Sequence, residues 1–461
     1  MNVVLISTYE LGRQPFGLAS PAAWLKEAGA SVTCLDLAVQ PLSDGEDEVA
    51  SADLVAFYVP MHTATRIAAS VVGQIRRINP STHLCFYGLY ASVNEGFLRE
   101  LGADSILGGE FEQRLVDLVK DLEAGGRLGE VSKQPDVVSL GRQQFRVPDR
   151  SGLPALARYA HVSLPSGKQR VVGYTEATRG CKHLCRHCPI VPVYGGSFRV
   201  VQRDVVLRDI ELQVAAGAEH ITFGDPDFFN GPAHALAIVR ELHERYPEVT
   251  YDVTIKVEHL LVHAEHLPAL RDTGCLFVTS AVESIDSRIL EFFDKRHTQE
   301  EFRRVVEIFR EVGLTLNPTF VTFTPWTTLR GYVDLLTTLF ELDLVDNVAP
   351  IQYAIRLLIP TGSKLLELPE TQAVIGEYNQ ASLSYPWMHP DPAVDELYHA
   401  VMAEIRAGQA NGESRRAIFQ RVWCLAQRAY DSSVIMKLDL AQVDQAPPRS
   451  EVPYLTEPWY C

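Results

Sequence analysis

Three cysteines lie close together in the sequence, with a spacing that suits a metal cluster. They belong to the run Ala177-Thr-Arg-Gly-Cys-Lys-His-Leu-Cys-Arg-His-Cys-Pro189, in the pattern Cys-x3-Cys-x2-Cys. Three thiolates on one short loop can hold three irons of a 4Fe–4S cluster and leave the fourth iron without a protein ligand. An open metal position allows a substrate or cosubstrate to bind there. We therefore predict that Cys181, Cys185 and Cys188 bind a catalytic 4Fe–4S cluster.

A structural zinc site completed by His183 or His187 is the alternative to a cluster. Zinc ribbons usually supply their ligands as two separated pairs, and the sequence has no second cysteine pair of this kind. The spacing therefore favours the iron–sulfur cluster over zinc.

Composition and charge exclude several classes of protein. The 461 residues are 46% apolar and 22% charged, as in an ordinary globular protein of two or three domains. A net charge of −16 argues against a nucleic-acid-binding surface. No basic segment precedes the first apolar stretch, and no apolar run approaches the roughly 18 residues of a membrane helix. We expect a cytoplasmic protein with reduced thiols and with no nucleic-acid or membrane partner.

Short apolar strands alternate with amphipathic helical patterns over residues 1–125. Strands are expected at 3–7, 32–36, 52–58 and 83–87, and helices at 22–28, 65–78 and 111–122. Such alternation is typical of a doubly wound, Rossmann-like parallel sheet, which binds ligands beyond the carboxyl ends of its strands. Residues 126–170 are rich in Gly, Pro and polar residues, which predicts a linker.

A regular series of βα units follows from residue 171 to about residue 360. Strands are expected at 171–176, 220–223, 250–255, 276–281, 314–323 and 348–358. Six units predict an α/β fold with a partial (β/α)6 TIM barrel, which places its chemistry on the loops after its strands. Residues 361–461 are expected to form a helical region that ends in an extended, proline-rich tail.

Polar residues follow the expected strands at one end of this barrel. After the cysteine loop they are, in chain order, Asp225 and Asp227, Lys256 and Glu258, Glu283 and Ser284, Thr322 and Thr324, and Arg356. One acidic residue after a strand is usually a helix cap. A polar residue after every strand, in phase with the same end of the barrel, indicates a binding site.

The cysteine run resembles the signature of the radical S-adenosylmethionine (radical SAM) family. In that family the open iron binds the amino and carboxylate groups of SAM, and the cluster cleaves the sulfonium. The resemblance implies an enzyme, a small-molecule substrate, and an external electron donor such as flavodoxin or ferredoxin.

The same resemblance implies roles for the polar residues. Gly224 lies where the family receives the SAM amino group, with either Asp225 or Asp227 as the acceptor, and Phe223 would pack near the adenine. The other predicted contacts to SAM are Glu258, Glu283 and Ser284 for its ribose or amino acid part, and Arg356 or Lys256 for its carboxylate. Two readings of Lys295 stay open, a SAM contact and a solvated helix end.

The first domain resembles the cobalamin-binding-like domain that precedes many radical SAM barrels. Pro15-Phe-Gly17, Leu35-Asp-Leu37, Tyr87-Gly88 and Gly108-Gly-Glu110 fall where that domain has its turns. The Asp-x-His-x-x-Gly loop that would supply a cobalt-ligating histidine does not occur. Two alternatives therefore stay open: a domain that binds cobalamin, and a retained fold that packs on the barrel without a cofactor.

The ending Pro458-Trp-Tyr-Cys461 resembles a subgroup of radical SAM proteins associated with arsinothricin antibiotic biosynthesis. There a 3-amino-3-carboxypropyl group of SAM is joined to trivalent arsenic. Because As(III) prefers thiolates, Cys461 is predicted to be the catalytic thiol that presents arsenite to the barrel. The alternatives are a methyltransferase or 5′-deoxyadenosyl-radical enzyme acting on an organic substrate, and an iron–sulfur sensor.

Overall fold

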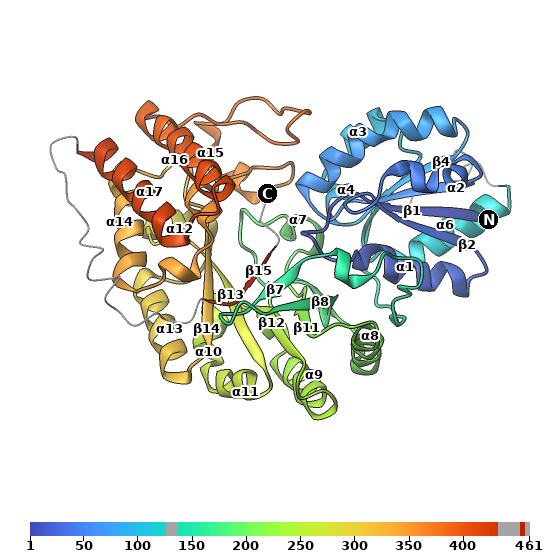
Figure 1. The fold of residues 1–461 in the computed structure, drawn as a ribbon. Helices are drawn as coiled ribbons and strands as arrows, with labels where there is room; N and C mark the ends of the chain where they lie inside the picture. Colours follow the sequence, from blue (N-terminus) through green and yellow to red (C-terminus); the bar gives the residue numbers. More distant parts are fainter. Residues whose placement is uncertain (126–136, 432–451, 457–461) are drawn as a thin grey trace.

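The computed structural model describes residues 1–125, 137–431 and 452–456. Figure 1 shows two α/β units side by side: an N-terminal sheet flanked by helices, and a curled sheet with helices along its outer face. The predicted fold class, a doubly wound domain followed by a partial barrel, is confirmed. Within the described ranges, no helix is both long enough and apolar enough to span a membrane.

The N-terminal sheet is parallel throughout, with strand order β2-β1-β3-β4-β5-β6. Its strands are β1 (Asn2–Ser7), β2 (Ser31–Asp36), β3 (Leu54–Tyr58), β4 (His83–Tyr87), β5 (Ser105–Gly109) and β6 (Val138–Ser139). Strand β5 is not among the expected strands, because Gly108-Gly-Glu110 at its end indicates a turn. Val3 and Leu5 of β1 pack on one face and Val4 and Ile6 on the other, which explains why these strands are continuously apolar.

Helices cover both faces of this sheet. The helices are α1 (Phe16–Glu27), α2 (Glu46–Ala50), α3 (His62–Ile78), α4 (Leu89–Val93), α5 (Glu95–Glu100) and α6 (Glu112–Glu123). Helices α1 and α6 share one hydrophobic core, and α3 contributes to the core on the opposite face. The loops after β1, β3, β4 and β5 therefore form the edge of the sheet at which folds of this kind bind ligands.

The second sheet has strand order β14-β13-β12-β11-β8-β7-β15. Its strands are β7 (His161–Ser163), β8 (Gln169–Thr175), β11 (His220–Phe223), β12 (Thr250–Thr254), β13 (Cys275–Glu283), β14 (Thr315–Phe320) and β15 (Tyr454–Leu455). The helices that follow the strands are α8 (Arg203–Ala215), α9 (Pro232–Arg245), α10 (Val257–Val262), α11 (Leu267–Asp272), α12 (Ser287–Phe293), α13 (Gln299–Val312) and α14 (Leu329–Glu341). Strands β8 and β11–β14 are parallel to one another and form the half-barrel.

The prediction of a sixth barrel strand at 348–358 is wrong. This segment contains the short helix η6 (Pro350–Ala354), and only one bridge, between Phe323 and Arg356, marks the place of the strand. Pro350 has no N–H to donate to a ladder. The Gln352 side chain accepts the hydrogen bond from the Phe320 N–H (2.9 Å) that a neighbouring strand would otherwise accept.

Two segments far apart in the sequence complete the sheets. The linker contributes β6 to the first sheet and β7 to the second. The C-terminal region forms α16 (Pro392–Ala410) and α17 (Arg415–Tyr430), and then β15, which pairs antiparallel with β7. The Pro453 carbonyl, beside β15, accepts a hydrogen bond from Asn317 of β14 (3.4 Å), so residues 452–456 touch both edges of the curled sheet.

Candidate active site

The three cysteines lie on a loop that leaves and re-enters a two-stranded ribbon. Strand β9 (Thr178–Gly180) pairs antiparallel with β10 (Phe198–Val200), and the loop between them carries the short helix α7 (Val191–Tyr194). Gly180 has φ +75°, and a Cβ there would lie 2.4 Å from the Tyr194 ring, so the entry to the loop requires glycine. The Cys188 N–H donates to the Cys185 carbonyl (3.1 Å) and turns the chain between these thiols.

Two neighbouring segments hold the cysteine loop in place. The Asn230 side chain, in the loop after β11, accepts from the Lys182 N–H and donates to the Gly180 carbonyl (both 3.2 Å). On the other side, the Arg186 N–H donates to the Phe293 carbonyl at the end of α12 (2.9 Å). These contacts fix the backbone of the loop on both sides of the cysteines.

The thiols fit a cationic metal centre. Burial, with smaller contributions from neighbouring thiols, raises the pKa of Cys181 to about 11 and that of Cys188 to about 12. Three thiolates at such a place need metal charge to stabilise them. His183 contacts Asp227 and Lys256 through its two ring nitrogens, and His187 contacts Glu283, so the contacts of both imidazoles are with residues other than the cysteines. This arrangement favours a three-cysteine cluster over the zinc alternative.

A cavity of about 690 Å³ fills the lumen of the half-barrel. Its polar lining comes from alternate strand residues, whose neighbours pack outward into the main hydrophobic core. The lining includes Phe223, Gly224 and Asp225 from the end of β11, Thr254, Thr279, Asn317 and Thr319 from the next strands, and Tyr454 and Thr456 from the C-terminal segment. Three predicted SAM contacts, Phe223, Gly224 and Asp225, therefore line the same cavity as the described part of the tail, and the other predicted contacts lie outside this lining.

Asp225 is the predicted SAM contact that most needs a positive partner. Its carboxylate accepts from the Ala177 N–H (2.9 Å) and the Thr178 hydroxyl (2.6 Å). Burial raises its pKa to about 7 in spite of these hydrogen bonds, and no side chain in the described residues forms an ion pair with it. An ammonium group in the lumen would supply the missing charge, as SAM does.

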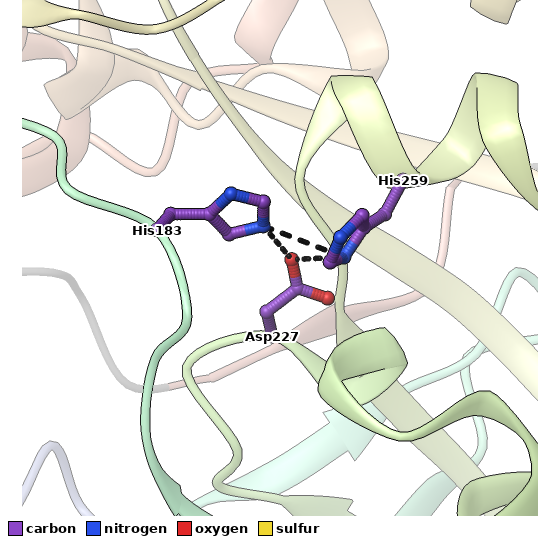
Figure 2. A group of neighbouring side chains, drawn as sticks. All are labelled: His183, Asp227 and His259. Atoms are coloured by element: carbon purple, nitrogen blue, oxygen red, sulfur yellow. Dashed lines mark hydrogen bonds and ion pairs between the residues drawn. The ribbon is translucent and has the colours of Figure 1, made fainter. Parts of the chain in front are cut away.

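A second group of predicted residues gathers beside the cysteine loop. Asp227 contacts His183 (3.1 Å) and His259 (2.7 Å), as Figure 2 shows, and Lys256 pairs with Glu258 (2.9 Å) and lies 3.3 Å from His183 Nδ1. Sequence reasoning named His183 only as a ligand in the zinc alternative, and it missed His259. The repeated histidines of the cysteine run and of α10 were the available signal.

A third group surrounds Glu283 at the end of β13, where φ is +68°. Burial raises the pKa of this carboxyl, but Lys295 (3.4 Å) and His187 (3.1 Å) outweigh it and lower the pKa to about 2. Lys295 is 3% exposed, which contradicts the solvated helix end. Neither ring nitrogen of the buried His297 has a partner among the described residues, nor does His187 Nδ1. These orphaned nitrogens fit a polar ligand such as SAM. Sequence reasoning missed His297 and named His187 only as a ligand in the zinc alternative.

Two predicted residues are engaged elsewhere. The Ser284 hydroxyl accepts from the Asp286 N–H (3.0 Å) in a turn. Arg356 pairs with Asp395 of α16 (2.7 Å) and stacks on Trp387 at 3.6 Å from the ring centroid. Cys461 lies outside the described residues.

A buried ionic cluster joins the two domains, and sequence reasoning missed it. Arg179, two residues before Cys181, pairs with Glu112 (2.6 Å), Glu176 (2.6 Å) and Glu110 (3.4 Å). Glu110 and Glu112 follow β5 of the N-terminal sheet, so the first domain holds the strand that leads into the cysteine loop.

One cavity between the domains is smaller than a corrinoid. A cavity of about 190 Å³ lies there, lined by Tyr58, Phe111, Arg179, Tyr194 and Gly224, among others. Proteins use about 300–1,000 Å³ for one drug-sized ligand, and a corrinoid is larger still. Protein produced with excess cobalamin is accordingly expected to carry little of it. Stoichiometric cobalamin in the visible spectrum of the purified protein would contradict this prediction.

The half-barrel and the cysteine loop at its mouth define the class of protein. Residues 175–330 match the family model of the radical SAM superfamily, so the chain carries a radical SAM domain. Such a domain makes the protein an enzyme that uses a 4Fe–4S cluster and SAM. The alternative of an iron–sulfur sensor is therefore set aside.

Sequence relatives include named methylating enzymes. The chain is 24% identical over 328 residues to the hopanoid C-3 methylase of Methylococcus capsulatus, an alignment that covers 68% of this chain and 62% of that protein. It is 23% identical over 274 residues to an uncharacterized methyltransferase of Pyrococcus horikoshii, with 56% of each chain covered. The chain thus spans less than two thirds of the length of these relatives.

Two solved structures share the two-domain fold. The cobalamin-dependent SAM radical enzyme OxsB superimposes with a TM-score of 0.67 at 16% identity, covering 88% of this chain and 66% of OxsB. The radical SAM methyltransferase TsrM of Kitasatospora setae superimposes with a TM-score of 0.67 at 16% identity, covering 88% and 89%. At these identities the likeness is one of fold.

Replacing Asp225 with Asn is expected to weaken SAM binding about 10- to 150-fold, because one charge-assisted hydrogen bond contributes roughly 1.5–3 kcal/mol. Equilibrium dialysis of reconstituted protein measures the affinity, and the iron content shows whether the cluster survives. Asp252→Asn is the matched control, since Asp252 lines the same lumen but already accepts from His220 and Thr222. Unchanged affinity in Asp225→Asn would place the acceptor elsewhere.

Proposed function

We propose that the protein transfers a carbon group of SAM to a small substrate held in the barrel lumen. The observation that carries this proposal is the 690 Å³ cavity, which has the Phe223–Asp225 segment in its wall. Its volume lies in the range that proteins use for one drug-sized ligand. SAM is itself of that size, so the space left over suits only a small substrate.

The chain's own residues would hold SAM and keep it from water. Asp225 would accept from its ammonium group, and Phe223, which is 1% exposed, would pack against the adenine. Glu283, kept ionised by Lys295, would accept from the ribose or the amino group, with His297 as a further polar contact. When bound, the cluster supplies the electron that cleaves the sulfonium. An external donor such as flavodoxin or ferredoxin is the proposed source of electrons.

The group we propose first is 3-amino-3-carboxypropyl, and the acceptor is As(III). A C–S bond of SAM breaks and a C–As bond forms: SAM, arsenous acid, an electron pair and a proton give methylthioadenosine, the aminocarboxypropyl arsonous acid and water. What supports a role for Cys461 is the position of Thr456, which lines the lumen only a few residues before this thiol. As(III) prefers such soft ligands.

Methyl transfer to an organic substrate is the second candidate. The names of the Methylococcus and Pyrococcus relatives and of TsrM favour it. The cavity of about 190 Å³ between the domains is smaller than a corrinoid, which argues against the cobalamin-assisted form of this reaction.

Product analysis decides between these candidates. With dithionite, SAM and arsenite, the reconstituted enzyme is expected to release methylthioadenosine and an amino acid with an As–C bond, and Cys461→Ala is expected to lower that yield while cluster and SAM binding persist. Cys424→Ala is the control, since Cys424 is an exposed thiol of α17. If arsenite leaves SAM cleavage unchanged and 5′-deoxyadenosine or S-adenosylhomocysteine accumulates instead, the arsenic assignment fails.

A further inference from the structure

A second group of metal-ligating side chains lies beside the cysteine loop. His183 comes from the loop itself, Asp227 from the loop after β11, and His259 from α10. Figure 2 shows both imidazoles directed at the same carboxylate oxygen. The side chains of His183, Asp227 and His259 are 10%, 1% and 5% exposed, respectively. Three separate segments thus bring two nitrogens and one oxygen together away from solvent.

The spacing of these three atoms suits a single bound ion. His183 Nε2 lies 3.1 Å from Asp227 Oδ2, His259 Nδ1 lies 2.7 Å from the same oxygen, and the two nitrogens are 3.4 Å apart. A triangle with these sides has a circumradius of about 1.8 Å. One ion placed slightly above its plane can therefore lie about 2.0–2.1 Å from all three atoms, the usual bond length for Zn²⁺ to nitrogen and oxygen ligands.

The surrounding contacts orient the ligands. The other oxygen of Asp227 accepts from the Phe229 N–H (2.9 Å), which fixes the carboxylate. His183 Nδ1 faces the Lys256–Glu258 pair, with Lys256 Nζ at 3.3 Å and Glu258 Oε2 at 3.6 Å. Lys256 pairs with Glu258 (2.9 Å), so its charge stays compensated when a cation binds.

We propose that His183, Asp227 and His259 form a second metal site, distinct from the cluster, for a borderline divalent cation of the Zn²⁺ type. Two imidazoles and one carboxylate suit Zn²⁺, Co²⁺ or Fe²⁺ and not the all-oxygen preference of Mg²⁺ or Ca²⁺. Three protein ligands leave a coordination position for water or substrate. The assignment uses Asp227 for metal and leaves Asp225 as the acceptor for the SAM amino group.

The test uses Co²⁺ as a probe in the full-length Cys181→Ser/Cys185→Ser/Cys188→Ser variant, which removes the cluster and its colour. We expect about one equivalent of Co²⁺ with the absorption of a nitrogen- and oxygen-ligated ion. Adding His259→Gln or Asp227→Asn should lower the affinity more than about 100-fold. Glu258→Gln should lower it about 10- to 100-fold, as outer-shell changes do. In the reconstituted wild-type holoenzyme, elemental analysis should find zinc in addition to the cluster iron.

The control tests a neighbouring, more exposed group of side chains that could also bind the metal ion. His263, Glu265 and His266 also place ligand atoms within 4.8 Å of one another. His263→Gln/His266→Gln in the same background should leave Co²⁺ binding unchanged, and circular dichroism should show all variants folded. Absence of Co²⁺ binding, binding unaffected by His259→Gln, or loss of binding only in the His263/His266 variant would each overturn the proposal. These measurements involve no SAM cleavage, so they succeed or fail independently of the proposed reaction.

Discussion

Changing Cys181, Cys185 or Cys188 to Ala is expected to remove the iron–sulfur cluster and, with it, all cleavage of SAM. Wild-type protein reconstituted under strict anaerobiosis should bind about four irons and four sulfides, with a brown chromophore. Each thiolate is one of the three proposed protein ligands, and the loop that carries them is held by Asn230 and by the end of α12. Because each single variant would leave only two thiolates for the cluster, the loss should be nearly complete in every one of them.

The matched control for the cluster is Cys424→Ser. This thiol is free and exposed on α17, so the variant should keep its iron, its colour and its activity. Iron and acid-labile sulfide analysis, together with electron paramagnetic resonance of the reduced protein, measure the outcome. Stoichiometric zinc with no brown chromophore in the wild type would falsify the cluster assignment and revive the zinc alternative.

Replacing Arg179 with Met is expected to destabilise the protein by about 3–5 kcal/mol, because it leaves buried carboxylates without their counter-charge. Glu112 is 0% exposed, and although burial raises its pKa, Arg179 outweighs burial and lowers it. The double variant Arg179→Met/Glu112→Gln should recover part of the loss, since it removes the uncompensated charge as well. Denaturant unfolding followed by circular dichroism gives the free energies.

Arg304→Met provides the comparison for this large effect. Arg304 also pairs with two glutamates, Glu307 and Glu311, but at the exposed face of α13. Its loss should change stability by no more than about 1 kcal/mol, the usual value of surface ion pairs. A loss of similar size in both variants would show that the interdomain cluster contributes little more than a surface network.

Most of the fold could be predicted because local patterns of apolar residues indicate its strands and helices. The strands β1–β4 and the barrel strands β8 and β11–β14 are apolar runs that lie between segments with helical periodicity. Because these strands are buried on both faces, their apolar pattern can be recognised in the sequence. The sixth barrel strand was mispredicted because Gln352, through its side chain, takes the hydrogen bond that a strand would accept. Apolar periodicity cannot distinguish the two arrangements.

Site residues could be predicted where a local motif or a position directly after a strand indicated them. The cysteine spacing is local in sequence, so the cluster ligands could be proposed directly. Arg179 and Glu112 lie 67 positions apart, and the sequence around either residue contains no signal that predicts their pairing. His297 follows a run of charged residues, which favours a solvated surface, yet it is 6% exposed. Such residues become visible only when the tertiary contacts are known.

The pairing of β15 with β7 has a consequence for how the protein is made. Residues 452–456 are among the last of these 461 to leave the ribosome, and they complete the edge of a sheet whose other strands come much earlier. The wall of the lumen therefore closes only after residues 452–456 have been synthesised. Until these residues emerge, the barrel interior stays open along one side.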